Sequence, residues 1–246
     1  MLYVPQKLDL TNVTIAVIDT VCHELTRMAV EKCKSNAKFG GIRIFSDRDM
    51  GPDTVRVSLS SFDEAMQFSL YELPNYLDTS HVMFMHWDSW IIDPGMWRKE
   101  FLECDYIGAP WWYKDGLNVG NSGFSLRSVR LMKYLTKHKD RFPPGDMEDS
   151  VLCRQYRPIL EKEGFTWASE ELATEFSFER KRPAIDSRHF GFHGAFNFPF
   201  VCSYEELNEI MAIARKNPYL QKNGMLDEIY GIWAARYGVA YGISRG

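Results

Sequence analysis

Short apolar runs alternate with helical patterns along the first third of the chain. Four of these runs are typical of buried strands and lie at residues 13–18, 42–45, 55–59 and 81–85. Two segments with apolar side chains at helical spacing lie between them, at residues 22–37 and 62–77. Strands and helices that alternate over short links predict a mostly parallel sheet flanked by helices on both faces, which is an α/β fold.

The pattern loosens beyond Trp90. Two further short strands are expected at residues 106–108 and 124–126, on either side of a turn at Lys114-Asp115-Gly116. They predict an antiparallel extension of the sheet. Helices are expected at residues 97–102, 128–138, 148–163, 204–216 and 226–237. The third of these helices should bend at Pro158, and the last two should end the chain as C-terminal helices.

Composition and missing motifs disfavour several classes of protein. The formal net charge of −4 gives no overall attraction to nucleic acid or to anionic membranes. The sequence contains neither a G-x-x-x-x-G-K-[ST] phosphate loop nor a G-x-G-x-x-G dinucleotide motif. No run approaches about 18 consecutive apolar residues, so no membrane span is expected. The five cysteines include no C-x-x-C pair, which predicts free thiols in a reducing compartment and therefore a cytoplasmic location.

Three aspartates directly follow predicted strands. Asp19 and Asp47 follow the first and second strands, and Asp88 lies just past the fourth, between Trp87 and Ser89. Because ligands of open α/β sheets bind beyond the carboxyl ends of the strands, all three can face one crevice. Asp19 and Asp47 are equally compatible with helix caps or turns. The polar and aromatic surroundings of Asp88 favour a functional role, such as binding a hard cation.

Two other groups of residues have a structural and a functional interpretation. The acidic pair Glu148-Asp149 begins a predicted helix, where it either complements the helix dipole or supplies a general base. His193 lies in the run FGFHGA, where it is either a hydrogen-bonded core residue or a ligand. The glycines on both sides of His193 allow the backbone to approach a ligand closely.

Five short segments, taken in order, carry a resemblance to a known family. They span about residues 79–195 and read HWDSW, DYIGAPWW, VGNSGFSLRS, EDS and FGFHGAF. Together they resemble a little-characterised family of glycosyltransferase-like proteins with the GT-A fold. More distantly, they resemble the fringe-type β-1,3-glycosyltransferases. The most specific part is DYIGAPWW followed by GNSGFSLRS.

The resemblance implies a single GT-A-like domain over residues 1–246. About residues 1–90 would form the nucleotide-binding half, about 91–200 the acceptor and catalytic half, and 201–246 the C-terminal helices. The implied activity is that of a glycosyltransferase of the hexosyl- or pentosyltransferase class. It would move a sugar from a nucleotide-sugar donor, with UDP as the expected nucleotide, to a hydroxyl of a glycan or another acceptor, with inversion.

The resemblance also implies roles for particular residues. A strand-end D-x-D motif holds Mn²⁺ or Mg²⁺ in this fold; here it reads HWD, so Asp88 matches its last carboxylate and His193 matches a late histidine of the metal shell. Asp149, ahead of Glu148, matches the catalytic base of inverting members. Donor binding is implied for Asp19, Thr20, Ser46, Asp47, Ser60, His86, Trp87, Asp88 and Ser89. Sugar and acceptor binding is implied for Trp111, Trp112, Asn121, Ser122 and Gly123.

Two alternative functions stay open. His86 stands where the first carboxylate of D-x-D is expected, which is compatible with an inactive nucleotide- or sugar-binding module that kept the fold. The basic run at residues 180–182, together with Arg188, is compatible either with a solvated loop or with a phosphate-binding patch. The second reading would suit transfer to a modified base in DNA, although the net charge disfavours a nucleic-acid acceptor.

Overall fold

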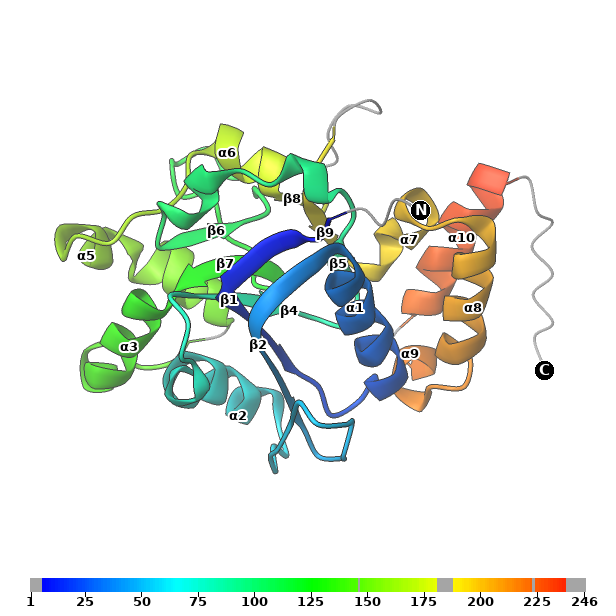
Figure 1. Cartoon of the computed structure of the whole chain (residues 1–246), viewed down its shortest axis with the longest axis horizontal. Helices are drawn as coiled ribbons and strands as arrows, with labels where there is room; N and C mark the ends of the chain where they lie inside the picture. The colour runs from blue at the N-terminus through cyan, green and yellow to red at the C-terminus, as the bar shows by residue number, and fades with distance from the viewer. Residues whose placement is uncertain (1–5, 146, 181–187, 223, 238–246) are drawn as a thin grey trace.

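A computed structural model describes residues 6–145, 147–180, 188–222 and 224–237. Its centre is a six-stranded sheet with the order β3-β2-β1-β4-β7-β6 (Figure 1). The strands are β1 (Leu8–Ile18), β2 (Ala37–Ser46), β3 (Thr54–Arg56), β4 (His81–Met85), β6 (Tyr106–Gly108) and β7 (Phe124–Ser128). The first four strands pair in parallel, whereas β7 is antiparallel to both of its neighbours. The predicted α/β fold with an antiparallel extension is confirmed.

Both faces of this sheet are buried. Successive side chains of a strand point to opposite sides, so each central strand contributes to two cores. Ile15 and Val17 of β1 pack in a core with α1 (His23–Asn36) and the C-terminal helices. Ala16 of β1 and Phe84 of β4 pack on the other face. That face is covered by α3 (Val129–Lys137) and by the helical segment that begins with α2 (Phe62–Gln67). The segment continues as a π-helical turn over Phe68–Glu72 and a 3₁₀ turn over Leu73–Tyr76.

A second, three-stranded sheet has the order β5-β9-β8 and was not predicted from the sequence. Its strands are β5 (Ser89–Ile91), β8 (Ser177–Phe178) and β9 (Gly191–His193). The antiparallel pairing of β5 with β9 places Ser89 opposite His193. Segments that are a hundred residues apart in the chain therefore meet directly after the end of β4.

The predicted helix over residues 148–163 is broken into three pieces. They are α4 (Glu148–Ser150), a π-helical turn over Val151–Gln155 and α5 (Arg157–Lys162). The break lies at Tyr156 rather than at Pro158, which occupies the first turn of α5. Proline is tolerated there because the N–H that it lacks would have no partner within the helix. Another helix, α6 (Glu170–Phe176), was not predicted and is capped by the Ser169 side chain.

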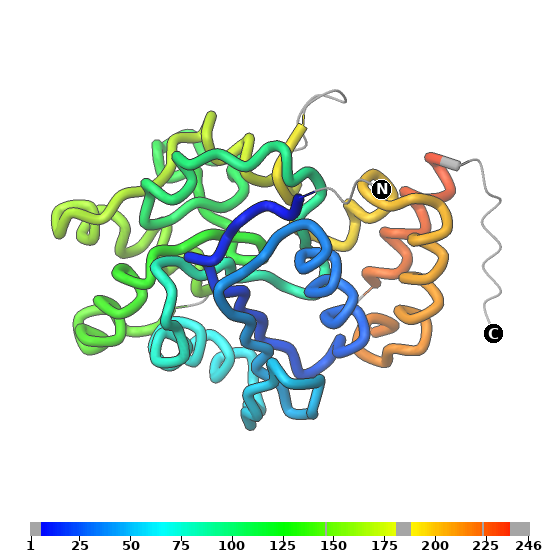
Figure 2. Tube along the Cα trace, in the orientation of Figure 1, coloured from blue at the N-terminus to red at the C-terminus, as the bar shows by residue number. Residues whose placement is uncertain are grey.

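The C-terminal helices pack beside α1, at one edge of the molecule (Figures 1 and 2). They are α7 (Phe198–Val201), α8 (Tyr204–Ala214), α9 (Pro218–Lys222) and α10 (Met225–Tyr237), and the two longer ones match the predicted helices. A capping box formed by Ser203 and Glu206 begins α8. The Lys32 Nζ atom of α1 lies 2.6 Å from Glu206 Oε1, and the Asn217 amide donates to the Val21 carbonyl at 2.7 Å. The C-terminal helices are therefore fixed against α1 and against the residues that precede it.

All five cysteines are unpaired, as predicted, while the cytoplasmic location stays a prediction. Among the described residues, no helix has both the length and the apolarity that a membrane crossing requires.

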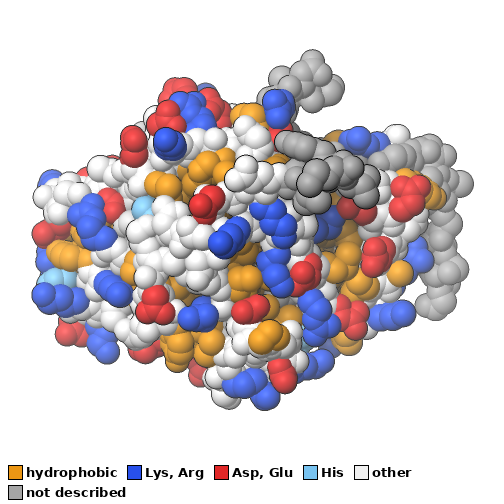
Figure 3. Space-filling model, viewed as in Figure 1, with side chains coloured by type: hydrophobic (Ala, Val, Ile, Leu, Met, Phe, Trp, Pro, Cys, Tyr) orange, Lys and Arg blue, Asp and Glu red, His pale blue; other side chains and the backbone are white. Residues whose placement is uncertain are grey.

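Basic and acidic side chains are mixed over the face shown in Figure 3, in keeping with the small net charge. In the described part of the predicted basic patch, Arg180 pairs with Glu228 at 2.7 Å and Arg188 with Asp93 at 2.6 Å. Lys181 and Arg182 lie outside the described residues.

Candidate metal centre and adjoining cleft

Three side chains that can ligate a metal meet just beyond the carboxyl end of β4. They are His86, Asp88 and His193, and their ligand atoms all lie within 4.8 Å of one another. His86 and Asp88 come from the β4–β5 connection, and the pairing of β5 with β9 brings His193 to them (Figure 1). The rings of the two histidines are 5.3 Å apart, in an edge-to-face arrangement. Sequence reasoning singled out all three residues, and the structure brings them together.

Asp88 is buried and held by the backbone of the loop that follows β9. Its Oδ2 atom accepts a hydrogen bond from the Ala195 amide at 3.0 Å, and its carbonyl accepts one from the Gly194 amide at 3.0 Å. Its Oδ1 atom lies 3.5 Å from His193 Nε2. Burial alone would raise the pKa of the Asp88 carboxyl, but His193, His86 and the Ala195 amide together outweigh burial and hold that pKa below its usual range. Asp88 is therefore an anion within the cluster.

The two histidines differ in their electrostatic surroundings. Burial and the nearby His193 lower the pKa of His86 to about 4, so its imidazole is neutral near pH 7. Burial would also lower the pKa of His193, but the carboxylates of Asp88 and Glu179 outweigh it and raise that pKa to about 10. His193 Nδ1 lies 3.5 Å from Glu179 Oε1. The Glu179 carboxylate thus supports His193 from the side away from Asp88.

Sequence reasoning missed Glu179. It lies in a charged stretch before the residues that the structure does not describe, and no pattern in the sequence separates it from its charged neighbours. The side-chain amide of Asn197 links the segment that contains Glu179 to the segment that contains His193. It donates to the His193 carbonyl at 2.8 Å and to the Glu179 carbonyl at 3.3 Å. A carboxylate behind a ligating histidine is the usual support of metal-bound imidazole.

One distance within the cluster, that between Asp88 and His193, fits a shared metal ion. Ligand atoms that sit at about 2.1 Å from one ion are about 3–3.5 Å apart. The 3.5 Å between Asp88 Oδ1 and His193 Nε2 matches this spacing and is too long for a strong hydrogen bond. His193 Nδ1 is buried and makes no hydrogen bond, so neither nitrogen of this ring is fully satisfied by the protein. The donor set of two imidazoles and one carboxylate can therefore hold a divalent cation.

Gly123 makes room for His193. A Cβ atom at this position would lie only 2.0 Å from His193 Nε2, and the Gly123 carbonyl accepts a hydrogen bond from the His86 amide at 2.9 Å. The glycine-rich loop, residues 120–123, therefore contacts two of the three candidate ligands, His86 and His193.

Replacing Gly123 by alanine is therefore expected to displace His193 and to weaken Mn²⁺ binding by roughly tenfold or more, as the loss of support for a ligand does. The Mn²⁺ affinity can be measured by isothermal titration calorimetry. Gly231→Ala in α10 is the matched control, since nothing lies within 4 Å of its added methyl group. Equal Mn²⁺ affinity in the two variants would show that His193 is not confined by this loop.

A cleft of about 420 Å³ opens beside the cluster. It is lined by the ends of β1 and β4, by the start of α2, and by residues of the glycine-rich loop and of α9. Its lining residues are Ile18, Asp19, Thr20, Val21, Leu59, Ser60, Ser61, Phe62, Ala65, Met66, Phe84, His86, Trp87, Ser122, Met147 and Tyr219. Four large apolar side chains in this lining are exposed by 41% (Val21), 55% (Phe62), 44% (Met147) and 46% (Tyr219). Exposed apolar side chains gathered around one cleft are typical of a ligand site.

The cleft contains most, but not all, of the predicted donor-binding residues. Asp19, Thr20, Ser60, His86 and Trp87 line it. The Oδ1 atom of Asp19 accepts hydrogen bonds from the amides of residues 21 and 22, so Asp19 is also a turn residue. Its Oδ2 atom is buried and has no hydrogen-bond partner in the protein. The structural and the functional interpretation of Asp19 are thus compatible with each other.

Four predicted donor residues lie outside the cleft lining: Asp88, which belongs to the candidate metal centre, and Ser46, Asp47 and Ser89. Asp47 pairs with His23, whose Nε2 atom lies 2.6 Å from Asp47 Oδ1, and this pair faces the start of α1. Ser46 is fully buried at the end of β2. Ser89 is also fully buried and exchanges hydrogen bonds with the backbone of His86. Ser46 and Asp47 do not line this cleft, so their predicted part in donor binding stays a prediction.

The two acidic residues that begin α4 have different environments. Glu148 is 1% exposed and forms an ion pair with Arg127, which is itself fully buried. Asp149 is half-buried and accepts hydrogen bonds from the Ser122 amide at 3.3 Å and the Ser150 amide at 2.7 Å. Burial and the neighbouring Glu148 carboxylate raise the pKa of Asp149 to about 6. Asp149 is therefore the carboxylate of the pair that remains accessible to a ligand.

The loop Asn121–Gly123 lies between Asp149 and the metal cluster. Asn121 has a left-handed backbone with φ of 64°, and its Oδ1 atom is buried without a partner. Ser122 lines the cleft and donates its amide to Asp149. Strained backbone and an unpaired polar atom are both common features of functional loops.

The two neighbouring tryptophans differ in exposure. Trp111 is only 8% exposed and packs over Gly120, where a Cβ atom would lie 2.1 Å from its ring. Its predicted role as a sugar platform is therefore wrong, since its ring is already covered by the protein. Trp112 is 61% exposed, on the turn that the antiparallel bridge between Pro110 and Val119 closes. Of the two, Trp112 is the ring available to a ligand.

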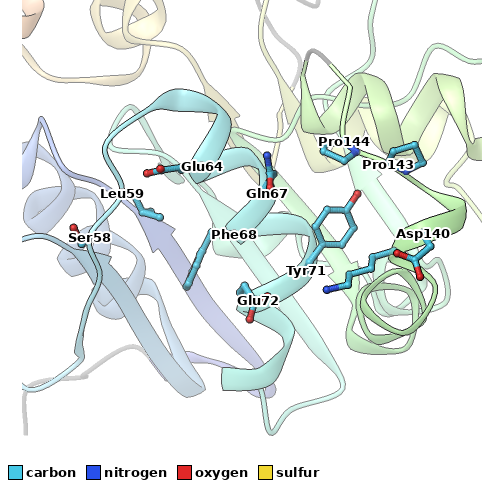
Figure 4. A pocket seen from close by; sticks show the side chains of 11 residues that line it. Ser58, Leu59, Glu64, Gln67, Phe68, Tyr71, Glu72, Asp140, Pro143 and Pro144 are labelled. Atoms are coloured by element: carbon cyan, nitrogen blue, oxygen red, sulfur yellow. The ribbon is translucent and has the colours of Figure 1, made fainter.

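A larger hollow of about 640 Å³ lies elsewhere on the surface. Figure 4 shows that Phe68 and Tyr71 of the helical segment after α2 border it on one side and Pro143 and Pro144 on the other. None of the three cluster residues lines this hollow. The smaller cleft, not this hollow, adjoins the candidate metal ligands.

The chain belongs to a family described as "Protein of unknown function (DUF5672)", whose model matches residues 64–193, a little over half of the chain. The matched segment runs from within α2 to His193 and so includes all three candidate metal ligands. No curated protein matches the sequence.

Two solved structures show the class of fold. One is a glycosyltransferase involved in the glycosylation of the major capsid of PBCV-1, with a TM-score of 0.51 at 10% identity, covering 82% of this chain and 98% of the other. The other is the galactosyltransferase LgtC in complex with donor and acceptor sugar analogues, with a TM-score of 0.50 at 13% identity, covering 83% and 96%. The fold is thus that of the GT-A glycosyltransferases. The distant resemblance to fringe-type enzymes stays a prediction.

Proposed function

We propose that this protein is a metal-assisted glycosyltransferase that uses a nucleotide-sugar donor. The observation that carries the proposal is the cluster of His86, Asp88 and His193 at the end of β4, directly beside a cleft of about 420 Å³ on a GT-A fold. Ligands of open α/β sheets bind at this edge. A nucleoside diphosphate needs a cation for its phosphates and an apolar-edged cleft for its base. The candidate cation ligands lie directly beside such a cleft in this protein.

The donor would occupy the cleft with its nucleotide, for which UDP is our expectation. Thr20 and Ser60 offer hydroxyl groups to the ribose and base. Phe62 and Tyr219, both exposed at the cleft, offer faces on which the base can stack. The halves at about residues 1–90 and 91–200 would then be the donor and acceptor sides of one domain, with the C-terminal helices contributing Tyr219.

The cation would be held by His86, Asp88 and His193. A divalent cation bound there would neutralise the charge that develops on the leaving nucleoside diphosphate. Imidazole ligands suit later transition metals and carboxylates suit hard cations, so the mixed set favours Mn²⁺ over Mg²⁺. His86 in the first position of the motif therefore changes the metal preference without removing the site.

Asp149 would act as the general base of an inverting reaction. Its carboxylate takes the proton of the acceptor hydroxyl while that oxygen forms a bond to the anomeric carbon. The bond from this carbon to the diphosphate oxygen breaks on the opposite face, and the electron pair leaves with the nucleoside diphosphate.

The loop Asn121–Gly123 and the exposed Trp112 would contact the sugar and the acceptor, a glycan or another hydroxyl-bearing molecule. No described contact favours a nucleic-acid acceptor, since Arg180 and Arg188 both have acidic partners.

A thermal-shift panel tests the proposed donor class. UDP-glucose, UDP-galactose, UDP-N-acetylglucosamine and GDP-mannose would each be added with Mn²⁺, with Mg²⁺ and with EDTA. A bound donor at a hundredfold over its dissociation constant stabilises the folded state by about 2.7 kcal/mol. We expect a UDP-sugar to raise the melting temperature with Mn²⁺ and not with EDTA. A panel in which no nucleotide sugar shifts the melting temperature would contradict the proposal.

Tyr219→Ala is expected to weaken the binding of UDP. Loss of one base–aromatic stack costs about 1–3 kcal/mol, which corresponds to roughly 5- to 150-fold in the dissociation constant. Tyr219→Phe keeps the aromatic face and is expected to bind UDP as the parent does. Titration calorimetry with UDP and saturating Mn²⁺ measures both variants. Unchanged affinity in Tyr219→Ala would place the base elsewhere in the cleft.

A further inference from the structure

A closed circuit of polar contacts joins the two acidic residues of α4. Glu148 forms an ion pair with Arg127, and Arg127 Nε donates to Ser125 Oγ at 3.0 Å. The Ser125 hydroxyl donates to the Ser122 carbonyl at 3.2 Å, and the Ser122 amide donates to Asp149 Oδ2 at 3.3 Å. Since Asp149 follows Glu148 in the chain, the circuit begins and ends on the same turn of helix.

The charged pair in this circuit is fully buried, which calls for an explanation. Arg127 is 0% exposed and Glu148 is 1% exposed. Burying two charges costs desolvation energy that their attraction often does not repay, so apolar residues of similar size would stabilise the fold as well or better. The pair is therefore poorly explained by stability alone.

Arg127 is held rigidly in the sheet. Its guanidinium lies 4.5 Å from the ring centre of Phe84 in β4 and 5.3 Å from that of Tyr106 in β6. These rings fix a planar group from two neighbouring strands. The circuit thus connects the rigid centre of the sheet to the loop that lies against Asp149.

We propose that Arg127 and Glu148 are positioning residues that hold the loop Asn121–Gly123 and the Asp149 carboxylate in a fixed relative position. The inference rests on the proposed role of Asp149 as the base. Glu148 does not touch the substrate: it anchors Arg127, and Arg127 anchors the loop through Ser125. The sequence pair Glu-Asp thus divides into one structural and one reactive carboxylate.

The electrostatic surroundings of Asp149 make the circuit measurable. Burial has the largest effect on the pKa of Asp149 and raises it; the Glu148 carboxylate raises it further, and Arg127 lowers it. The other titratable groups that interact with Asp149 are Tyr106 of β6 and Cys153 of the following π-helical turn, and burial keeps both neutral near pH 7 by raising their pKa values. Removing the Glu148 charge should therefore lower the pKa of Asp149, because burial then acts alone against the Ser122 and Ser150 amides and Arg127, which all lower that pKa.

The test is a carbon-13 NMR titration of the Asp149 carboxyl carbon, assigned by its loss in Asp149→Asn. We expect a midpoint near pH 6 in the parent and a downward shift of about one unit in Glu148→Gln. The Ser122 amide shift should follow the same titration, since this amide donates to the carboxylate. Glu163→Gln is the control, because it neutralises a glutamate paired with Arg141 on the surface. Glu148→Gln and Glu163→Gln variants with the same Asp149 midpoint would overturn the proposal.

A second variant keeps the test decisive if Glu148→Gln does not fold. Arg127→Met/Glu148→Met removes both charges and leaves no buried ion unpaired. In that protein we expect the Asp149 midpoint to shift downward by less than in Glu148→Gln. The chemical shift of the Ser122 amide should no longer change with the titration of Asp149. A Ser122 amide that still follows Asp149 as in the parent would overturn the inference. The titrations need no sugar donor, so failure of the circuit and failure of the proposed activity give separate results.

Discussion

Asp88→Asn is expected to abolish Mn²⁺ binding and sugar transfer together. The amide keeps the shape of the side chain and its contact with the Ala195 amide, but it removes the only negative charge among the three clustered ligands. A cation would then be held by two imidazoles alone, one of which needs to give up a proton to bind. We expect no saturable Mn²⁺ binding by calorimetry at concentrations that saturate the parent, and no transfer.

The control for this variant is Asp93→Asn. Asp93 lies five residues further along the chain, pairs with Arg188 and contacts none of the cluster residues through any described bond. It is expected to bind Mn²⁺ as the parent does. If Asp88→Asn and the parent bind Mn²⁺ with equal affinity, Asp88 is not a ligand and the cation site lies elsewhere.

Asp149→Asn is expected to lower kcat by about 10²–10⁴-fold with little change in donor affinity, as the loss of a general base does. In the parent, kcat should fall as the pH drops through about 6, because the pKa of Asp149 is raised to that value and the base must be ionised to act. The pH dependence of kcat measured with a fixed donor tests both statements. A variant with near-parental kcat would place the base elsewhere or indicate a retaining reaction.

The stability of Asp149→Asn separates catalysis from helix capping. The folded-state pKa of Asp149 is raised above its usual value, so the folded protein holds this proton more tightly than the unfolded chain. Stability is therefore lost as the pH rises from about 4 to about 6, and above that window the ionised Asp149 keeps a constant cost. An uncharged asparagine avoids this cost. We expect a melting temperature at pH 8 no lower than that of the parent, whereas loss of a capping group would cost about 1 kcal/mol.

The parts of the fold that follow from local patterns were predictable. The apolar runs of β1, β2 and β4 and the amphipathic α1 are visible in the sequence, because each is long enough for its periodicity to be recognised. Asp88 could be singled out because it directly follows one of these runs. The two-residue β8 and the three-residue β5 and β9 are too short to carry a periodic signal.

The remainder of the site depends on contacts between distant segments. His193 becomes a partner of Asp88 only through the pairing of β5 with β9, and Glu179 only through the turn after β8. Tyr219 reaches the cleft because the C-terminal helices pack on α1. Arg127 lies just past the strand predicted at residues 124–126, and its full burial against Glu148 depends on the packing of distant segments. No local pattern in the sequence carries this information.

The most direct test of the proposed activity is the release of nucleoside diphosphate from a UDP-sugar. The donor that gives the largest thermal shift would be incubated with the protein and Mn²⁺, and the UDP set free would be quantified by chromatography, with Asp88→Asn as the negative control. We expect slow Mn²⁺-dependent release by hydrolysis, which Asp88→Asn abolishes and a suitable hydroxyl acceptor accelerates. Tight binding of the donor with no release of UDP, with or without acceptors, would contradict the proposed activity and identify the protein as a binding module.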